Sequence, residues 1–160
     1  VFFGVGTQSN NPLNATNALT TSADSAGNAG EIKTQFPAGS GSANIDALVD
    51  TGSNAFFFNP PRTINLPMCG DNQAFFCPGT TQSYTGVMSG LNGVTNTVNF
   101  QIANADQGFS TMNEAFDDIG GDILDADIFD WGLPFFYGRS VYIVIDGQTS
   151  PAGPGPFFAF

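Results

Sequence analysis

One tetrapeptide in this chain combines residue types that could do chemistry together, Asp50-Thr51-Gly52-Ser53. It stands between two apolar runs, each of which is typical of a buried strand. Gly52 permits a sharp turn that brings backbone N–H groups to the Asp50 carboxylate, and the hydroxyls of Thr51 and Ser53 can donate to that carboxylate or stabilise the loop. The pattern predicts an ionisable group held in a rigid turn. Taken alone, it fits a capped structural turn without catalysis equally well.

The absence of histidine narrows the chemistry further. Without histidine these residues cannot form a Ser-His-Asp or Cys-His catalytic group or a His-ligated zinc site. The sequence also lacks a Gly-rich phosphate loop of the Walker or dinucleotide type. Carboxylate chemistry remains, and we predict no cofactor.

An acidic run is the second group of chemically interesting residues. Hard cations take oxygen ligands, so calcium binding is one interpretation, but the spacing lacks the Gly and Glu of an EF-hand loop. A solvated acidic loop is the favoured interpretation, and no metal site is predicted. The run consists of Asp117, Asp118, Asp122, Asp125, Asp127 and Asp130.

Composition indicates one β-rich domain. The 160 residues are 41% hydrophobic and include 17 Phe, 20 Gly and 10 Pro, a mixture of core and turn formers. The net charge is −11, with Lys33, Arg62 and Arg139 as the only cations. This balance argues against nucleic acid and anionic membrane surfaces as partners, and no apolar run is long enough for a membrane span.

Two cysteines, Cys69 and Cys77, stand eight positions apart in an Asn- and Thr-rich context. We predict a disulfide and therefore an oxidising compartment, with a pair of free buried cysteines as the alternative.

Several landmarks, taken in order, resemble the second lobe of pepsin-like aspartic proteases. The Asp-Thr-Gly-Ser motif after a hydrophobic strand is the most specific of them. A further phrase, Phe129 to Arg139, is similar to an uncharacterised family of exported bacterial proteins with pepsin-like lobes. The other matching segments are 1–6, 47–61, 128–136, 141–146 and 155–160.

The resemblance implies an all-β fold: a single pepsin-like lobe over residues 1–160, built as a closed or partly open barrel of antiparallel strands with at most one or two short helices. It also implies export to the periplasm, the cell surface or the extracellular space. A pepsin-like active site needs two Asp-Thr/Ser-Gly motifs, and this sequence has one. We therefore expect the partner to be a missing N-terminal lobe or a homodimer mate.

By the same resemblance, Asp50 is one of two carboxylates that share a proton and activate water against a peptide bond. Thr51 would hydrogen-bond across to the opposing loop, while Gly52 N–H and Ser53 Oγ would hold the Asp50 carboxylate. The implied partner is a polypeptide substrate. The alternative is a non-catalytic module that binds a peptide ligand or has a structural role.

Local patterns predict individual elements. Residues 94–102 alternate at period two, which predicts a strand after the Asn92-Gly93 turn. Thr111 and Glu114 form a possible capping box, which predicts a short helix through Ile119. The remaining predictions are a strand at 1–6, a strand at 18–21 from a weak pattern, a hairpin at 24–36, buried strands at 128–136 and 141–145, and a closing strand at 157–160.

Overall fold

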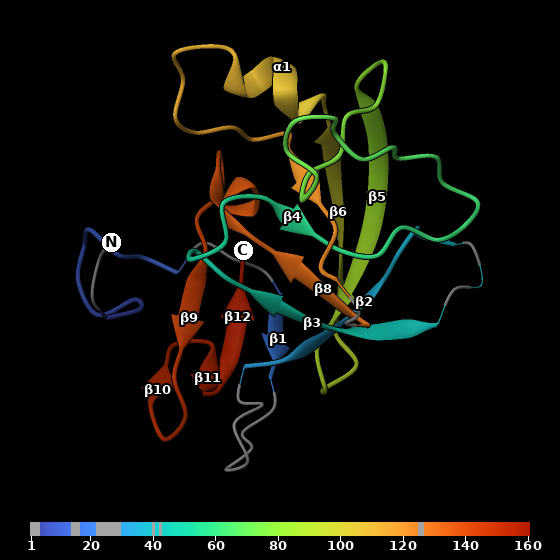
Figure 1. Cartoon of the computed structure of the whole chain (residues 1–160). Helices are drawn as coiled ribbons and strands as arrows, with labels where there is room; N and C mark the ends of the chain where they lie inside the picture. Colours follow the sequence, from blue (N-terminus) through green and yellow to red (C-terminus); the bar gives the residue numbers. More distant parts are fainter. Residues whose placement is uncertain (1–3, 14–16, 22–29, 40, 42, 125–126) are drawn as a thin grey trace.

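The computed structural model describes residues 4–13, 17–21, 30–39, 41, 43–124 and 127–160. These residues form a mostly β structure in which the largest sheet curls into a nearly closed, barrel-like shape (Figure 1). The described part contains one α-helix and one 3-10 helix. The predicted β-rich class with few helices is therefore confirmed.

The largest sheet has seven strands in the order β6-β5-β2-β3-β8-β4-β7. Its strands are β2 (Ile32–Gln35), β3 (Asn44–Val49), β4 (Phe56–Phe57), β5 (Gln82–Ser89), β6 (Thr95–Ile102), β7 (Gly120–Gly121) and β8 (Ile128–Trp131).

A smaller sheet of three strands pairs segments from the two ends of the chain, in the order β1-β12-β9. Its strands are β1 (Ala18–Thr20), β9 (Tyr142–Val144) and β12 (Phe157–Ala159), and a separate ribbon joins β10 (Thr149–Ser150) to β11 (Gly153–Pro154). The helices are α1 (Ala105–Phe109) and η1 (Leu133–Phe136).

The prediction of an antiparallel barrel is wrong for two pairings. β3 runs parallel to β8, and β4 runs parallel to β7, whereas the other pairings are antiparallel. β3 and β8 are far apart in sequence, so a long crossover can bring them into parallel register. In Figure 1 they lie side by side at the centre of the molecule.

Hydrophobic alternation worked best on β6. Val98, Phe100 and Ile102 face the core and are buried, while Asn99 and Gln101 between them are exposed. The turn at 91–93 joins β6 to β5, as the Asn-Gly signal predicts. The predicted strands at 18–21 and 157–160 are also confirmed.

Other local predictions are corrected. The helix is α1, which begins after Asn104, whose side chain accepts a hydrogen bond from Gln107 N at 3.0 Å. The residues of the supposed capping box, Thr111 and Glu114, lie outside any helix and are exposed. Asn104 supplies the cap instead, and the first helical residue, Ala105, is buried.

Four strand predictions also need correction. The strand predicted at 128–136 ends at Trp131, and Leu133–Phe136 form the 3-10 helix η1 instead. The hairpin predicted at 24–36 lies partly outside the described residues. Within the described part, β2 pairs with β3 and β5, and β1 ahead of it pairs with β12. β9 is not buried on both sides, because Ile143 is exposed. The predicted strand at 1–6 lies partly outside the described residues, and 4–6 form bends.

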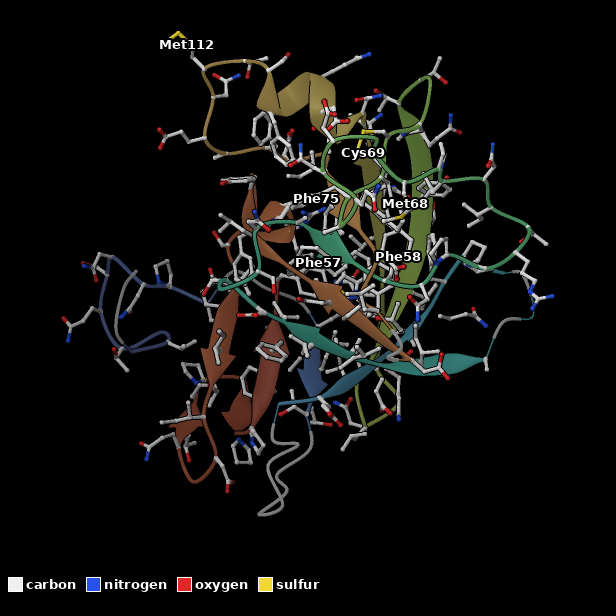
Figure 2. All side chains as sticks on the ribbon, in the orientation of Figure 1. Phe57, Phe58, Met68, Cys69, Phe75 and Met112 are labelled. Carbon is white, nitrogen blue, oxygen red and sulfur yellow. A yellow bond between two sulfur atoms is a disulfide. The ribbon has the colours of Figure 1, made fainter. Side chains whose placement is uncertain are left out.

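The core is a cluster of aromatic rings, some of which β8 and β4 contribute themselves. Phe58 and Phe129 stack at 4.8 Å between ring centroids, and Phe129 stacks on Trp131 at 4.4 Å. Phe58 lies in the middle of the molecule in Figure 2, whereas Met112 projects from the loop after α1. Trp131 is fully buried, as predicted, and its indole N–H donates to Thr34 Oγ1 at 2.9 Å. This cluster supports the underside of β8.

Candidate active site

The Asp50-Thr51-Gly52-Ser53 turn directly follows β3. Gly52 N–H donates to Asp50 Oδ1 at 2.7 Å, and Ser53 Oγ donates to Asp50 Oδ2 at 3.1 Å. Asp50 and Ser53 are half-buried, while Thr51 and Gly52 are exposed. Each carboxylate oxygen of Asp50 therefore has a local donor, and the group lies where solvent can reach it. These contacts are the ones expected of Gly52 and Ser53.

The end of β8 holds this turn on two sides. Asp50 N–H donates to Trp131 O at 3.1 Å, and Leu133 N–H donates to Ser53 O at 2.7 Å. Gly132 lies between these bonds, and a Cβ on it would come within 2.0 Å of Ala55 O and 2.8 Å of Ser53 O. Only glycine allows this close approach. The Asp50 turn and the Trp131-Gly132 step therefore form one packed unit.

Asp130 is the residue of this unit that the sequence interpretation missed. It belongs to β8, where it lies opposite Leu48 of β3, and it is buried rather than part of a solvated acidic loop. Burial raises the pKa of the Asp130 carboxyl group to about 6; a hydrogen bond from Ser53 opposes the rise, and the negative charge of Asp50 adds to it. The available signal was an Asp inside the apolar strand Ile128–Trp131.

The parallel register explains why Asp50 and Asp130 are neighbours. Leu48 pairs with Asp130 and Val49 with Trp131, so β3 delivers Asp50 to the end of β8 at which Asp130 lies. The structure thus brings a second carboxyl group to the predicted site within one chain. Thr51 stands exposed at the tip of the turn, and its contact across to an opposing loop stays a prediction.

A hollow of about 170 Å³ opens beside the turn. Asn54, which follows the motif, and Leu133 of η1 contribute to its wall, and the loop after α1 supplies most of the rest. The lining is mixed: apolar side chains lie beside Asn54, Asn113 and the carboxylate of Glu114. Its residues are Asn54, Phe109, Asn113, Glu114, Ala115, Phe116, Ile119 and Leu133.

The acidic run does not gather around one point. Asp117 and Asp118 line a different hollow of about 190 Å³ together with Arg139, whereas Asp130 is inside the sheet. Burial raises the pKa of the Asp118 carboxyl group, and the charge of Asp117 adds to the rise. Asp125 lies outside the described residues.

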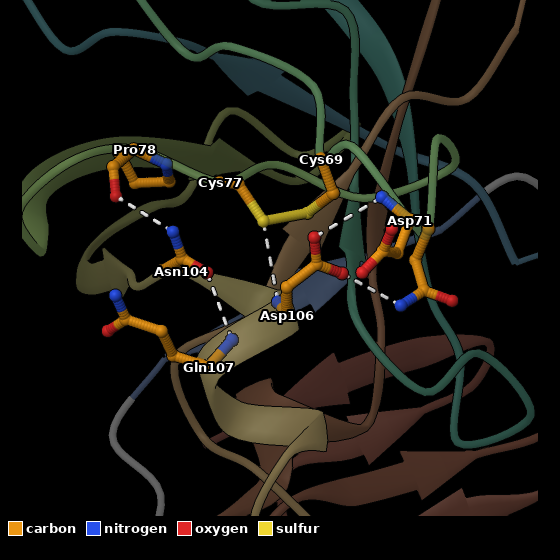
Figure 3. The surroundings of a disulfide bond; sticks show 8 residues. Cys69, Asp71, Cys77, Pro78, Asn104, Asp106 and Gln107 are labelled. Atoms are coloured by element: carbon orange, nitrogen blue, oxygen red, sulfur yellow. Dashed lines mark hydrogen bonds between the residues drawn. A yellow bond between two sulfur atoms is a disulfide. The ribbon is translucent and has the colours of Figure 1, made fainter.

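The predicted Cys69–Cys77 disulfide is present, at the side of the molecule where α1 lies (Figure 3). Asp106 of α1 accepts from Asn72 Nδ2 at 2.8 Å and from Asp71 N–H at 3.4 Å, while its own N–H contacts Cys77 Sγ at 3.4 Å. The two sulfurs and Asp106 lie close enough to share an ion. Metal binding needs thiolates, however, and both sulfurs are in the disulfide. This cluster is therefore a structural clamp.

Comparison with known families assigns the chain. A model of the family described as "Protein of unknown function (DUF3443)" matches residues 1–160. The chain belongs to this family. Searches of curated proteins and of solved structures find no match. Among the described residues, no helix has both the length and the apolar character needed to cross a membrane.

Proposed function

We propose that this chain is one lobe of an exported aspartic endopeptidase-like protein, with Asp50 as one of two water-activating carboxylates. The observation that supports this most strongly is the Asp50 turn itself. Its carboxylate is oriented by Gly52 N–H and Ser53 Oγ and remains accessible at the end of β3. The order of sequence landmarks that resemble the second lobe of pepsin-like proteases supports the same proposal.

The chemistry follows from the roles of a carboxylate pair. In the charged form, Asp50 accepts a proton from the attacking water, while an opposing carboxylic acid donates to the oxygen of the peptide carbonyl. Gly52 N–H and Ser53 Oγ keep Asp50 in one orientation during the transfer. The opposing acid comes from a second lobe or a second copy of this chain, because this sequence has a single Asp-Thr-Gly motif.

The hollow beside the turn fits a peptide side chain. Phe109, Phe116 and Leu133 offer an apolar wall next to the motif, which favours a substrate with an apolar side chain near the cleaved bond. The disulfide supports export, since such bonds persist in oxidising compartments.

The test is cleavage of a broad peptide library at acidic pH. The assay uses the 160-residue chain and the longest natural protein that contains it, each as wild type, Asp50→Asn and Asp46→Asn. Asp46 lies on β3, ahead of the motif, and pairs with Lys33, so it serves as the matched control. We expect cleavage that Asp50→Asn abolishes and Asp46→Asn leaves intact. A folded wild type without cleavage would contradict the proposal.

A binding module is the second candidate, and the single Asp-Thr-Gly motif favours it. The hollow beside the turn would then hold a peptide without cutting it. Peptides retained equally by wild type and Asp50→Asn, with no cleavage products, would support this alternative.

A further inference from the structure

Among the acidic residues in the described ranges, Asp130 alone is buried. The residue is 6% exposed, and its Oδ1 has no hydrogen-bond partner in the described part of the chain. A buried carboxylate oxygen without a partner is costly, so such a group is stable only with a proton or with a donor aimed at it.

The strands packed on either side of Asp130 carry few charges. β3 carries Asp46, which forms an ion pair with Lys33. Asp46 lies opposite Ile128, away from Asp130. β4 contributes only Phe56 and Phe57. The loop after β3 brings Asp50, and this is the charged group whose field acts on Asp130.

Ser53 stands between the two carboxyl groups. Its hydroxyl donates to Asp50 Oδ2 at 3.1 Å and also interacts with Asp130. A serine hydroxyl has one hydrogen to donate and two lone pairs that accept. Two charged carboxylates would compete for that hydrogen, whereas a protonated neighbour would instead donate to the serine oxygen.

We propose that Asp130 is a positioning residue for Asp50: its protonated carboxyl group donates to Ser53 Oγ, and this leaves the Ser53 hydrogen to Asp50. The inference rests on the proposed function for its catalytic meaning, and it adds a residue that the Asp-Thr-Gly-Ser motif does not contain. The chain itself then carries a directed series of hydrogen bonds, from Asp130 through Ser53 to Asp50.

This arrangement makes the site respond to pH. Below about pH 6 Asp130 keeps its proton, and the Ser53 hydroxyl is directed to Asp50. Above that pH Asp130 becomes an acceptor that competes for the same hydrogen, so the hold on Asp50 weakens. A site of this kind is ordered best under acidic conditions.

The test is a pH titration of the Asp carboxyl carbons by NMR, on the wild-type chain and three variants. In wild type, the Asp50 carbon is expected to show an inflection at the pH where Asp130 titrates. Asp50→Asn removes a negative neighbour and should shift the Asp130 titration to lower pH. Ser53→Ala removes the hydroxyl that links the two carboxyl groups and should weaken the shared inflection of the Asp50 carbon. Asp46→Asn is the control and should leave it in place.

An Asp130 that is coupled to Asp50 through charge alone would keep the shared inflection in Ser53→Ala. An Asp130 titration that is unchanged by Asp50→Asn would overturn the proposal, as would an Asp50 inflection that Ser53→Ala leaves unchanged or a wild-type Asp50 carbon without the shared inflection. The wild-type measurement needs no variant to fold. Because the titration uses no peptide cleavage, it decides the coupling even if the endopeptidase assay is negative.

Discussion

The region beneath β8 and the region around α1 are stabilised in different ways. Beneath β8, fully buried rings such as Phe58, Phe129 and Trp131 stack against each other without a cross-link. Around α1, the rings of Phe75 and Phe109 are only half-buried, and the Cys69–Cys77 disulfide closes the segment. In Figure 2, Cys69 lies near α1, away from the centrally placed Phe58.

The difference explains where the candidate site is located. The Asp50 turn is bonded to Trp131 O and packed on Gly132, so it depends on the buried ring cluster for its rigidity. The loop near α1 supplies the opposite wall of the hollow and lies on the less buried side. The catalytic role proposed for Asp50 would need the more rigid support, whereas a wall that receives a ligand could tolerate mobility.

The largest expected effect comes from removing the large buried ring that β8 itself contributes to the core. Trp131→Ala should lower the free energy of unfolding by about 3–5 kcal/mol, because it leaves a large cavity and removes the partner of buried Thr34. Phe109→Ala, on the half-buried side, should cost about 1–2 kcal/mol. Urea denaturation followed by circular dichroism measures both. Equal losses would show that the two regions do not differ as described.

Removal of the Cys69–Cys77 disulfide should cause the next largest loss of stability. Replacing Cys69 and Cys77 together by Ser should cost roughly 2–3 kcal/mol, the value expected from loop entropy for a short closed segment. The native fluorescence of Trp131 should stay unchanged, since that side chain lies in the other cluster. A shift in the native emission spectrum would mean that the two regions are coupled.

The stability of the protein should also depend on pH, through Asp130 of β8. The pKa of Asp130 is raised to about 6 in the folded state, against about 3.9 in an unfolded chain. The folded state therefore holds this proton more tightly. Its stabilisation is full below about pH 4 and is lost as pH rises through 6, for a total of roughly 2 kcal/mol after allowance for water near the turn.

Thermal unfolding at several pH values, with Asp130→Asn beside wild type, measures this effect. The decline between pH 4 and 6 should be smaller in the variant, because it lacks the titrating group. Asp118, whose pKa is also raised, would supply any part of the decline that remains. An identical decline in both proteins would assign the effect to other groups.

The smallest expected effect concerns Asp106, which connects α1 to the disulfide segment. Asp106→Ala removes two accepted hydrogen bonds at a half-buried position and should cost about 1 kcal/mol. Asp127→Ala, at an exposed position before β8, should change stability by less than about 0.5 kcal/mol. Hydrogen exchange in α1 should rise in the first variant and not in the second.

Local patterns predicted those parts of the molecule whose structure depends on near neighbours. The alternation of β6, the Asn-Gly turn before it and the short Cys69–Cys77 loop each involve residues close in sequence, and each is confirmed. The bonds from Gly52 and Ser53 to Asp50 are of the same kind, since the donors lie two and three residues from the acceptor.

Predictions failed where distant segments decide the outcome. Nothing near Thr111 shows that Asn104 is the better cap, because the choice depends on burying Ala105 in a cluster with the distant residues Ala55 and Cys69. β9 looked like a strand buried on both sides, yet it lies in a small sheet with Ile143 outward. Its apolar run fits either environment.

By itself, the sequence determined that this protein is mostly β, acidic, disulfide-closed and without histidine, and that Asp50 sits in a turn that can hold a carboxylate. Only the tertiary structure decided that β3 and β8 run parallel and that Asp130 lies beside Ser53. The physical reason is that pairing between distant strands depends on the whole arrangement of the core, which no short segment encodes. The environment of a carboxyl group, and hence its pKa, follows from that pairing.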